Sequence, residues 1–233
     1  MTPRAKAAIE SSDTIVGYIT YIKLIPELLE GKEVVSTGMK AEAERCKEAV
    51  RLAAEGKKVA FISSGDPGVY GMAGLALEVI KDAYPVYIPF DFEVVPGLPA
   101  VCSSAASLGA PLMHDFAVIS LSDLLTPWEL IKKRLHAAAS ADFVISLYNP
   151  RSKGRPGLLE EARGIIMEHR SGDTPVGIVK DSRRDEEEVI LTTLAELPFD
   201  KVDMTTMVII GNSSSYRFMD YIVTPRGYKG KRF

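Results

Sequence analysis

The chain alternates between two spacings of apolar residues, one typical of buried strands and one typical of amphipathic helices. Residues 13–18 and 58–63 are short apolar runs, and each predicts a strand. Residues 41–55 carry apolar side chains at helical spacing, and Gly56 is placed to end that helix. In this part of the chain we expect helices at 3–10, 41–55, 71–82 and 99–108, and strands at 13–18, 58–63 and 92–95. Strands that run through glycine-rich turns into helices are typical of parallel α/β construction.

The same alternation restarts after Gly109-Ala110-Pro111. We therefore expect an N-terminal α/β domain at residues 1–109 and a C-terminal α/β domain at residues 110–233. In the second domain we expect strands at 116–121, 143–148, 176–181, 188–191, 207–211 and 221–223, and helices at 127–139 and 156–170. The later strands lack long helices between them, so the second sheet is expected to be mixed.

Composition and charge narrow the class of protein. The chain has 233 residues, of which 46% are hydrophobic and 25% charged, as in ordinary globular proteins. A net charge of −3 argues against broad nucleic-acid binding, which needs a basic surface. No apolar run approaches the roughly 20 residues that cross a bilayer, and the first residues lack the apolar core of a signal peptide. We therefore expect a cytoplasmic protein without a membrane span.

The two cysteines, Cys46 and Cys102, lie far apart in the sequence and form no CxxC pair. Neither a disulfide nor a zinc site is therefore expected, and no metal is predicted. Both residues are interpreted as small buried thiols.

A glycine-rich turn, Ser63 to Gly71, follows the strand at 58–63. Its glycines allow a ligand to approach the backbone at the carboxyl end of the sheet, and Asp66 offers a carboxylate for ribose hydroxyls or an amino group. It is neither a Walker loop nor a G-x-G-x-x-G motif. Taken alone, the turn equally fits a tight connection from strand to helix.

Pro96-Gly97 repeats this arrangement ahead of a helix that is rich in small residues, including Ala100, Ser103 and Ser104. Small side chains allow close approach by a flat ligand, although packing of the helix on a sheet explains them nearly as well.

The segment from Ser120 to Trp128 gathers hydroxyls, a carboxylate and the single tryptophan into one loop. Thr126 is interpreted as a helix N-cap with Pro127 at the first helical position. Ser120, Ser122 and Asp123 are not needed for capping, so we expect them to line a site.

Two later loops are basic and also follow predicted strands. They contain Arg151 and Lys153, and Arg183 and Arg184. Guanidinium and ammonium groups suit carboxylates, so these residues could bind a polyanionic small molecule. A solvated charged loop is the alternative for each of them.

Of the three histidines, His136 and His169 are interpreted as surface groups on polar helix faces. His114, beside Asp115, is a candidate for proton transfer, with a structural role as the alternative. No Ser-His-Asp, metal-ligand or paired-carboxylate arrangement stands out.

These segments, in this order, are similar to the tetrapyrrole (corrin/porphyrin) methyltransferases, and within them to the precorrin-3B C17-methyltransferases of cobalamin biosynthesis. The resemblance covers essentially the whole chain and rests on residues 63–73, 109–116, 119–128, 147–153, 209–213 and 224–228. The Gly-Asp-Pro turn marks the wider family, whereas Ser-Leu-Ser-Asp-Leu-Leu-Thr-Pro-Trp and Tyr-Asn-Pro-Arg-Ser are more specific.

The resemblance implies the two-domain tetrapyrrole-methylase fold, a homodimer, and S-adenosyl-L-methionine held between the domains. The residues that it assigns to the cofactor are Gly65, Asp66, Val69, Ala100, Tyr148, Asn149 and, less firmly, Asp181 or Ser182. The implied reaction methylates C17 of a precorrin and contracts the macrocycle to a precorrin-4-type product.

Methyl transfer from a sulfonium depends on positioning more than on a strong base, which fits the lack of a base constellation. Ring contraction also needs proton transfers, for which His114, Ser122 and Asp123 are the candidates. Ser120, Arg151, Lys153, Arg183 and Arg184 are the candidates for binding the tetrapyrrole substrate.

The chain departs from the family pattern at two places. It begins at Met1-Thr2-Pro3, after the point at which the family has a strand and a Gly-Pro-Gly loop, so the first strand of the N-terminal sheet is expected to be missing. Pro99 stands where relatives carry threonine. Two alternatives stay open. One is a family member that acts on another macrocycle position or on a protein or RNA, and the other, suggested by the missing strand, is a truncated, non-catalytic protein that only binds tetrapyrrole or a pathway partner.

Overall fold

The computed structural model describes residues 1–38, 41–151, 154 and 156–228, and its contacts divide the chain into two compact units, Met1–Pro99 and Ala100–Phe233. The division precedes the expected boundary at 109/110 because helix α5 (Ala100–Leu108) packs on the strands of the second unit. Its buried residues Val101, Ala105 and Leu108 share a core cluster with those strands. None of the described helices is long and apolar enough to cross a membrane.

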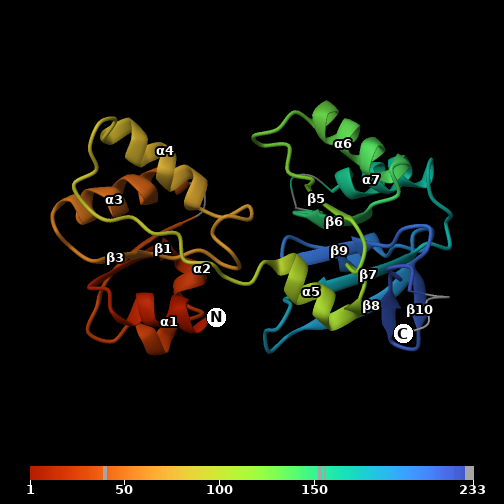
Figure 1. Ribbon diagram of the computed structural model, residues 1–233, viewed down its shortest axis with the longest axis horizontal. Helices are drawn as coiled ribbons and strands as arrows, with labels where there is room; N and C mark the ends of the chain where they lie inside the picture. The colour runs from red at the N-terminus through yellow and green to blue at the C-terminus, as the bar shows by residue number, and fades with distance from the viewer. Residues whose placement is uncertain (39–40, 152–153, 155, 229–233) are drawn as a thin grey trace. The chain divides into compact units, whose positions relative to one another are not determined.

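The first unit is built on a parallel sheet of three strands in the order β2-β1-β3. These are β1 (Thr14–Tyr18), β2 (Glu33–Thr37) and β3 (Val59–Phe61), with helices α1 (Pro3–Glu10), α2 (Ile19–Ile22), α3 (Glu42–Ala54) and α4 (Ala73–Ala83) and the 3-10 turn η1 (Pro26–Leu28). Figure 1 shows α3 and α4 over one face of this sheet and α1 and α2 over the other. In the central strand, Ile15 packs in the cluster with Ile9 and Ile22, and its neighbour Val16 packs with Leu52 on the opposite face.

The local signals in the first unit produce the expected elements. The Thr2 hydroxyl accepts a hydrogen bond from the Ala5 amide at 3.2 Å and caps α1, and Pro3 occupies the first turn. Gly56 adopts φ +89° just past α3, a conformation that glycine reaches without strain.

This unit differs from the prediction at several places: α2 and η1 were not predicted, and two strands differ as well. Residues 92–95 belong to none of the described sheets, so the strand predicted there is wrong. Phe92 and Val94 are both exposed, so little burial holds this segment against a sheet edge. Strand β2 was not predicted. None of its five residues is buried, so its sequence does not show the apolar run of a buried strand.

The second unit contains a five-stranded sheet in the order β5-β6-β9-β7-β8. The strands are β5 (Phe116–Ser120), β6 (Val144–Tyr148), β7 (Pro175–Lys180), β8 (Glu188–Thr193) and β9 (Thr206–Ile210). β5 and β6 are parallel, whereas β9 is antiparallel to both β6 and β7, which confirms the mixed sheet. Because β9 runs against both of its neighbours, β7 runs in the same direction as β5 and β6.

Alternate residues of this sheet enter two cores. Ile145 and Leu147 face the cluster beneath helices α6 (Trp128–Ser140) and α7 (Leu158–Met167), whereas Val144 faces α5. Figure 1 shows α6 and α7 on one side of the sheet and α5 on the other. Helix α6 begins with Pro127 at the N-cap in an extended conformation, so the predicted capping by Thr126 is wrong.

A small second sheet joins β4 (Gly109–Ala110), β10 (Tyr216–Phe218) and β11 (Tyr221–Val223), and a 3-10 turn η2 (Phe199–Lys201) lies before β9. β4 pairs in parallel with β11 through Gly109 and Ile222. A Cβ atom on Gly109 would lie 2.9 Å from the Cβ of Tyr221, and φ is +105°, so this contact requires glycine. The segment expected to be a domain boundary is therefore a strand.

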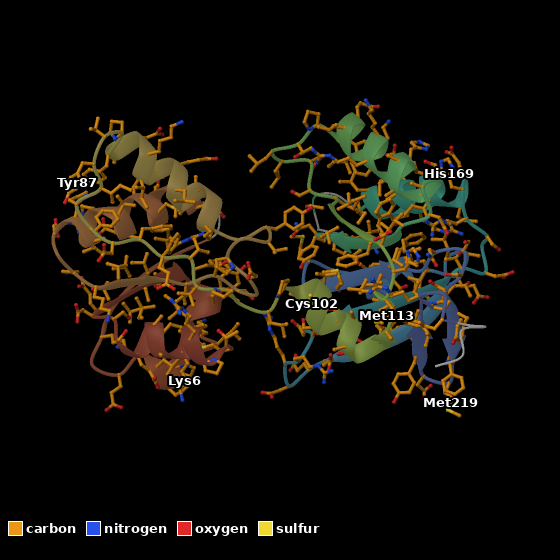
Figure 2. The ribbon with its side chains drawn as sticks, in the orientation of Figure 1. Lys6, Tyr87, Cys102, Met113, His169 and Met219 are labelled. Carbon is orange, nitrogen blue, oxygen red and sulfur yellow. The ribbon has the colours of Figure 1, made fainter. Side chains whose placement is uncertain are left out.

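The two thiols have different environments. Cys46 is fully buried in α3, and burial raises the pKa of its thiol to about 11. Cys102, labelled on α5 in Figure 2, is exposed, so the expectation of a buried thiol is wrong for this residue.

Arg170 is a buried cation that joins three elements of the second unit. Its guanidinium donates to the carbonyls of Gly211 and Phe143, each at 2.7 Å, and to that of Ala139 at 3.3 Å. It also lies 3.5 Å from the Asp142 carboxylate. These bonds link the ends of α6 and β9 to the start of β6.

We predict that Arg170→Ala lowers the free energy of unfolding by about 2–4 kcal/mol, because three buried carbonyls lose their donor. Urea denaturation measures the loss. Arg134→Ala, on the exposed side of α6, is the matched control and should change stability by less than about 0.5 kcal/mol. Equal losses in the two variants would contradict this role of Arg170.

Candidate functional site

The side chain of Asp66 links the glycine-rich turn from Ser63 to Gly71 to the segment around Gly97. Asp66 Oδ1 accepts a hydrogen bond from the Gly68 amide at 2.8 Å, and Oδ2 accepts one from the Gly97 amide at 2.9 Å. Asp66, whose carboxylate was predicted to face a ligand, therefore links the two loops. A carboxylate suits this position because both of its oxygens accept and both partners are N–H donors.

The two loops approach each other so closely that side chains are excluded between them. A Cβ atom on Gly97 would overlap the carbonyl oxygen of Gly65, which itself adopts φ +73°. Within the glycine-rich turn itself, a Cβ on Gly71 would lie 2.6 Å from the carbonyl oxygen of Pro67. Gly65 and Gly68 are exposed, Val69 is half-buried and Tyr70 is 57% exposed, so the turn presents main-chain groups together with apolar and aromatic side chains at its surface.

In the second unit, predicted site residues meet at the carboxyl ends of parallel strands. Ser120 ends β5, and Tyr148 ends β6 beside it. The Ser120 hydroxyl accepts from the Asn149 side-chain amide at 3.0 Å and from the Ser122 backbone amide at 3.2 Å. The Leu121 amide donates to the Tyr148 carbonyl at 2.9 Å. Ser120, Ser122, Tyr148 and Asn149 therefore form one connected group.

Tyr148 also brings the first turn of α5 to this group. Its hydroxyl accepts a hydrogen bond from the Val101 amide at 3.0 Å, next to Ala100. Asn149 adopts φ +50°, a left-handed conformation that asparagine tolerates better than most residues. Ala100, Tyr148 and Asn149, which the resemblance assigns to the cofactor, thus lie together. Ser103 and Ser104 are buried, which favours the packing interpretation of the small residues of α5.

Asp181 follows β7 at the same edge of the sheet, and its carboxylate already has protein partners. It accepts from the Arg184 guanidinium at 3.2 Å and from the Thr205 hydroxyl at 3.3 Å. Asp181 and Arg183 both adopt positive φ, 45° and 58°. The ammonium of Lys180 lies 2.8 Å from Asp203. Lys180, Asp203 and Thr205 were not singled out in the sequence, because only the antiparallel pairing of β7 and β9 brings them together.

Asp203 and Lys180 stabilise each other's charged forms. Burial acts to raise the pKa of Asp203, but hydrogen bonds from Lys180, Thr205 and Thr206 hold it below its ordinary value. The hydrogen bond and the charge of Asp203 raise the pKa of Lys180.

The basic residues predicted to bind carboxylates are placed differently from one another. Arg151 donates to the Phe199 carbonyl and is half-buried, whereas Arg183 and Arg184 are exposed on the loop after β7. Lys153 lies outside the described residues. Asp123 is exposed in the loop after β5.

The structure separates His114 from the other two candidates for proton transfer. His114 precedes the first residue of β5, whereas Ser122 and Asp123 follow its last residue. A five-residue strand is about 16 Å long at roughly 3.3 Å per residue. The His114 Nδ1 atom accepts from the Asp115 amide at 2.8 Å. The three residues therefore do not form one catalytic group.

Comparison with known proteins gives the family. The profile of the tetrapyrrole (corrin/porphyrin) methylases matches residues 1–198. The chain belongs to this family. It is 51% identical to a cobalt-factor III methyltransferase of Priestia megaterium over 99% of its own length, which is 43% of that relative. It is 49% identical to a probable cobalt-factor III C(17)-methyltransferase of Salmonella typhimurium, with 98% of this chain and 93% of that relative covered.

A solved structure supports the same family and fold. The methyltransferase CobJ matches with a TM-score of 0.90 and 36% sequence identity, covering 97% of this chain and 93% of that one. The two-domain tetrapyrrole-methylase fold expected from the sequence is therefore confirmed. The chain spans less than half of the Priestia relative but nearly all of the Salmonella relative and of CobJ.

We predict that Gly97→Ala lowers the free energy of unfolding by about 1–3 kcal/mol, because the loop must move away from Gly65. Gly74→Ala is the matched control: it lies in α4 with open space around it, and should be neutral or stabilising by up to about 1 kcal/mol. Urea denaturation compares the two. A Gly97→Ala variant as stable as the control would contradict the close contact.

Proposed function

We propose that this protein transfers the methyl group of S-adenosyl-L-methionine to C17 of precorrin-3B or of cobalt-factor III. Contraction of the macrocycle would then give a precorrin-4-type product in cobalamin biosynthesis. The observation that carries the proposal is the match, over 98% of the chain, to a relative named for this reaction. The two relatives that are 51% and 49% identical over the aligned residues are both named for cobalt-factor III, which favours the cobalt-containing substrate.

The residues present fit a nucleoside-bearing cofactor. Main-chain groups of the turn at Gly65, Asp66 and Val69 are accessible where glycines replace side chains. The second unit adds the side-chain amide of Asn149, the hydroxyl of Tyr148 and an apolar contact from Ala100. Asp181 offers a carboxylate. We propose that both sets of residues contact the cofactor, and that the protein acts as a cytoplasmic homodimer.

The cofactor would supply a methyl group that a carbon nucleophile can attack directly, because the positively charged sulfur leaves as a neutral thioether. The protein then contributes mainly by holding donor and acceptor in line. The hydrogen bonds to the Ser120 hydroxyl order the Ser120 and Asn149 side chains and the backbone of Ser122 before a ligand arrives. We assign the proton transfers of ring contraction to Ser122 and Asp123, which share this edge, ahead of His114.

The substrate is a large apolar macrocycle with a rim of carboxylates. Arg183 and Arg184, with Arg151 and Lys153, are the proposed partners of the carboxylates. Leu124 and Leu125 are 73% and 98% exposed in the same loop as Ser122 and Asp123. Exposed leucines beside a polar site suit the face of a macrocycle, and we propose that they contact it.

The decisive assay incubates the protein with S-adenosylmethionine carrying an isotopically labelled methyl group and, in turn, precorrin-3B and cobalt-factor III. Mass spectrometry and NMR of the product should locate one labelled methyl group at C17, with faster turnover of cobalt-factor III. Labelling at another position, or no labelling with folded protein, would overturn the proposal.

We predict that Asn149→Ala weakens binding of S-adenosylhomocysteine about tenfold, since it removes an ordered amide from the site. Isothermal titration measures the affinity. Ser140→Ala, at an exposed hydroxyl on α6, serves as the control and should bind as the unchanged protein does. Unaltered affinity in Asn149→Ala would remove this residue from the cofactor site.

We predict that Leu125→Ser raises KM for the tetrapyrrole about tenfold and leaves the affinity for S-adenosylhomocysteine unchanged, because apolar contact with the macrocycle is lost. Leu24→Ser, at an exposed leucine of the first unit, should alter neither quantity. If Leu125→Ser instead changed the affinity for S-adenosylhomocysteine and left KM for the tetrapyrrole unchanged, the proposed contact between Leu125 and the macrocycle would be contradicted.

A further inference from the structure

The packing of helices α6 and α7 brings the imidazole of His136 to the neighbouring side chains of Glu168 and His169, about thirty residues later in the sequence. His136 lies on α6, and Glu168 and His169 directly follow the last residue of α7. His136 Nδ1 is 3.2 Å from His169 Nε2 and 3.8 Å from Glu168 Oε2. One donor atom from each of the three residues lies within 4.8 Å of the other two. Figure 2 marks His169 at the edge of this helix pair.

We propose that His136, Glu168 and His169 bind a divalent transition-metal ion of the zinc class on the surface of the second unit. Two imidazole nitrogens and a carboxylate oxygen are ligands that Zn²⁺ accepts, whereas Mg²⁺ and Ca²⁺ favour oxygen alone. With Zn–N bonds of about 2.0–2.1 Å, two ligands of a tetrahedral site are roughly 3.3 Å apart. The separation of 3.2 Å between the two ring nitrogens matches that edge.

The backbone that carries these ligands is firmly held. Ile131 and Leu135 of α6 pack in one core cluster with Ile165 and Ile166 of α7. The His169 amide donates to the Ile166 carbonyl at 3.0 Å, which continues the helical turn beyond α7. Arg170, the next residue, is fixed by its buried hydrogen bonds. The three ligands therefore need only side-chain adjustment to close on an ion.

The charges around the site permit a cation. His136 and Glu168 line a groove between the two helices that is also lined by Glu129, Lys132, Lys133 and Glu161. The Lys132 ammonium lies 2.6 Å from Glu129 and 3.7 Å from Glu161, so its charge is locally balanced. With three protein ligands, at least one coordination position opens to the groove for water or an anionic ligand.

The alternative is a simple hydrogen bond between two neutral imidazoles, which the same 3.2 Å separation also allows. That bond involves the two histidines alone and makes no use of Glu168. Dependence of metal binding on all three residues therefore distinguishes the two cases.

Isothermal titration of the intact chain with ZnCl₂ at about pH 7.5 tests the proposal. The protein should carry no added histidine tag. We expect one binding site, with affinity reduced about tenfold or more in His136→Ala, His169→Ala and Glu168→Gln. His114→Ala, at the remaining histidine, is the control and should bind as the unchanged protein does.

A chemical readout keeps the test independent of small changes in folding. Diethyl pyrocarbonate should modify all three histidines without zinc and only His114 when zinc is saturating. Co²⁺ in place of zinc should give a visible ligand-field absorption that is lost in His169→Ala. An absence of heat and of protection at about 1 mM zinc, or equal binding by the Glu168→Gln and unchanged proteins, would overturn the proposal.

Discussion

The common direction of β5, β6 and β7 is the constraint on which the candidate site depends. Parallel strands end at the same edge of a sheet, so Ser120, Tyr148 and Asp181 come to one edge although they are far apart in the sequence. β9 lies between β6 and β7 and runs against both, which adds Thr205 to that edge. The opposite edge carries the buried contacts of Arg170, which stabilise the unit rather than line the site.

The first unit meets a different requirement, which is close approach of two loops. Asp66 satisfies two backbone amides from separate segments, and Gly97 is small enough to sit against Gly65. An arrangement of fixed main-chain groups suits the binding and alignment of an activated methyl donor. This is consistent with the lack of a single strong acid–base pair among the described predicted site residues, because His114 lies at the other end of β5 from Ser122.

Local signals predicted much of the fold, and non-local contacts account for what was missed. The capping by Thr2, the stop at Gly56 and the apolar run around Ile15 act within a few residues, so the sequence displays them directly. The pairing of Gly109 with Ile222 and the edge strand β2 depend on partners elsewhere in the chain.

In the candidate site too, the sequence shows the residue types but not their long-range partners. The hydroxyl, amide and carboxylate groups could be selected as polar residues that follow buried strands, but their partners could not. The bonds from Asn149 to Ser120 and from Gly97 to Asp66 join separate loops, and the pair His136 and His169 depends on the packing of α6 against α7.

Hydrogen exchange followed by mass spectrometry, with and without S-adenosylhomocysteine, tests the central claim most directly. The account predicts slower exchange in residues 65–71, 96–101 and 147–149, with β10 and β11 unchanged. Protection confined to other segments, or none at saturating ligand, would contradict it.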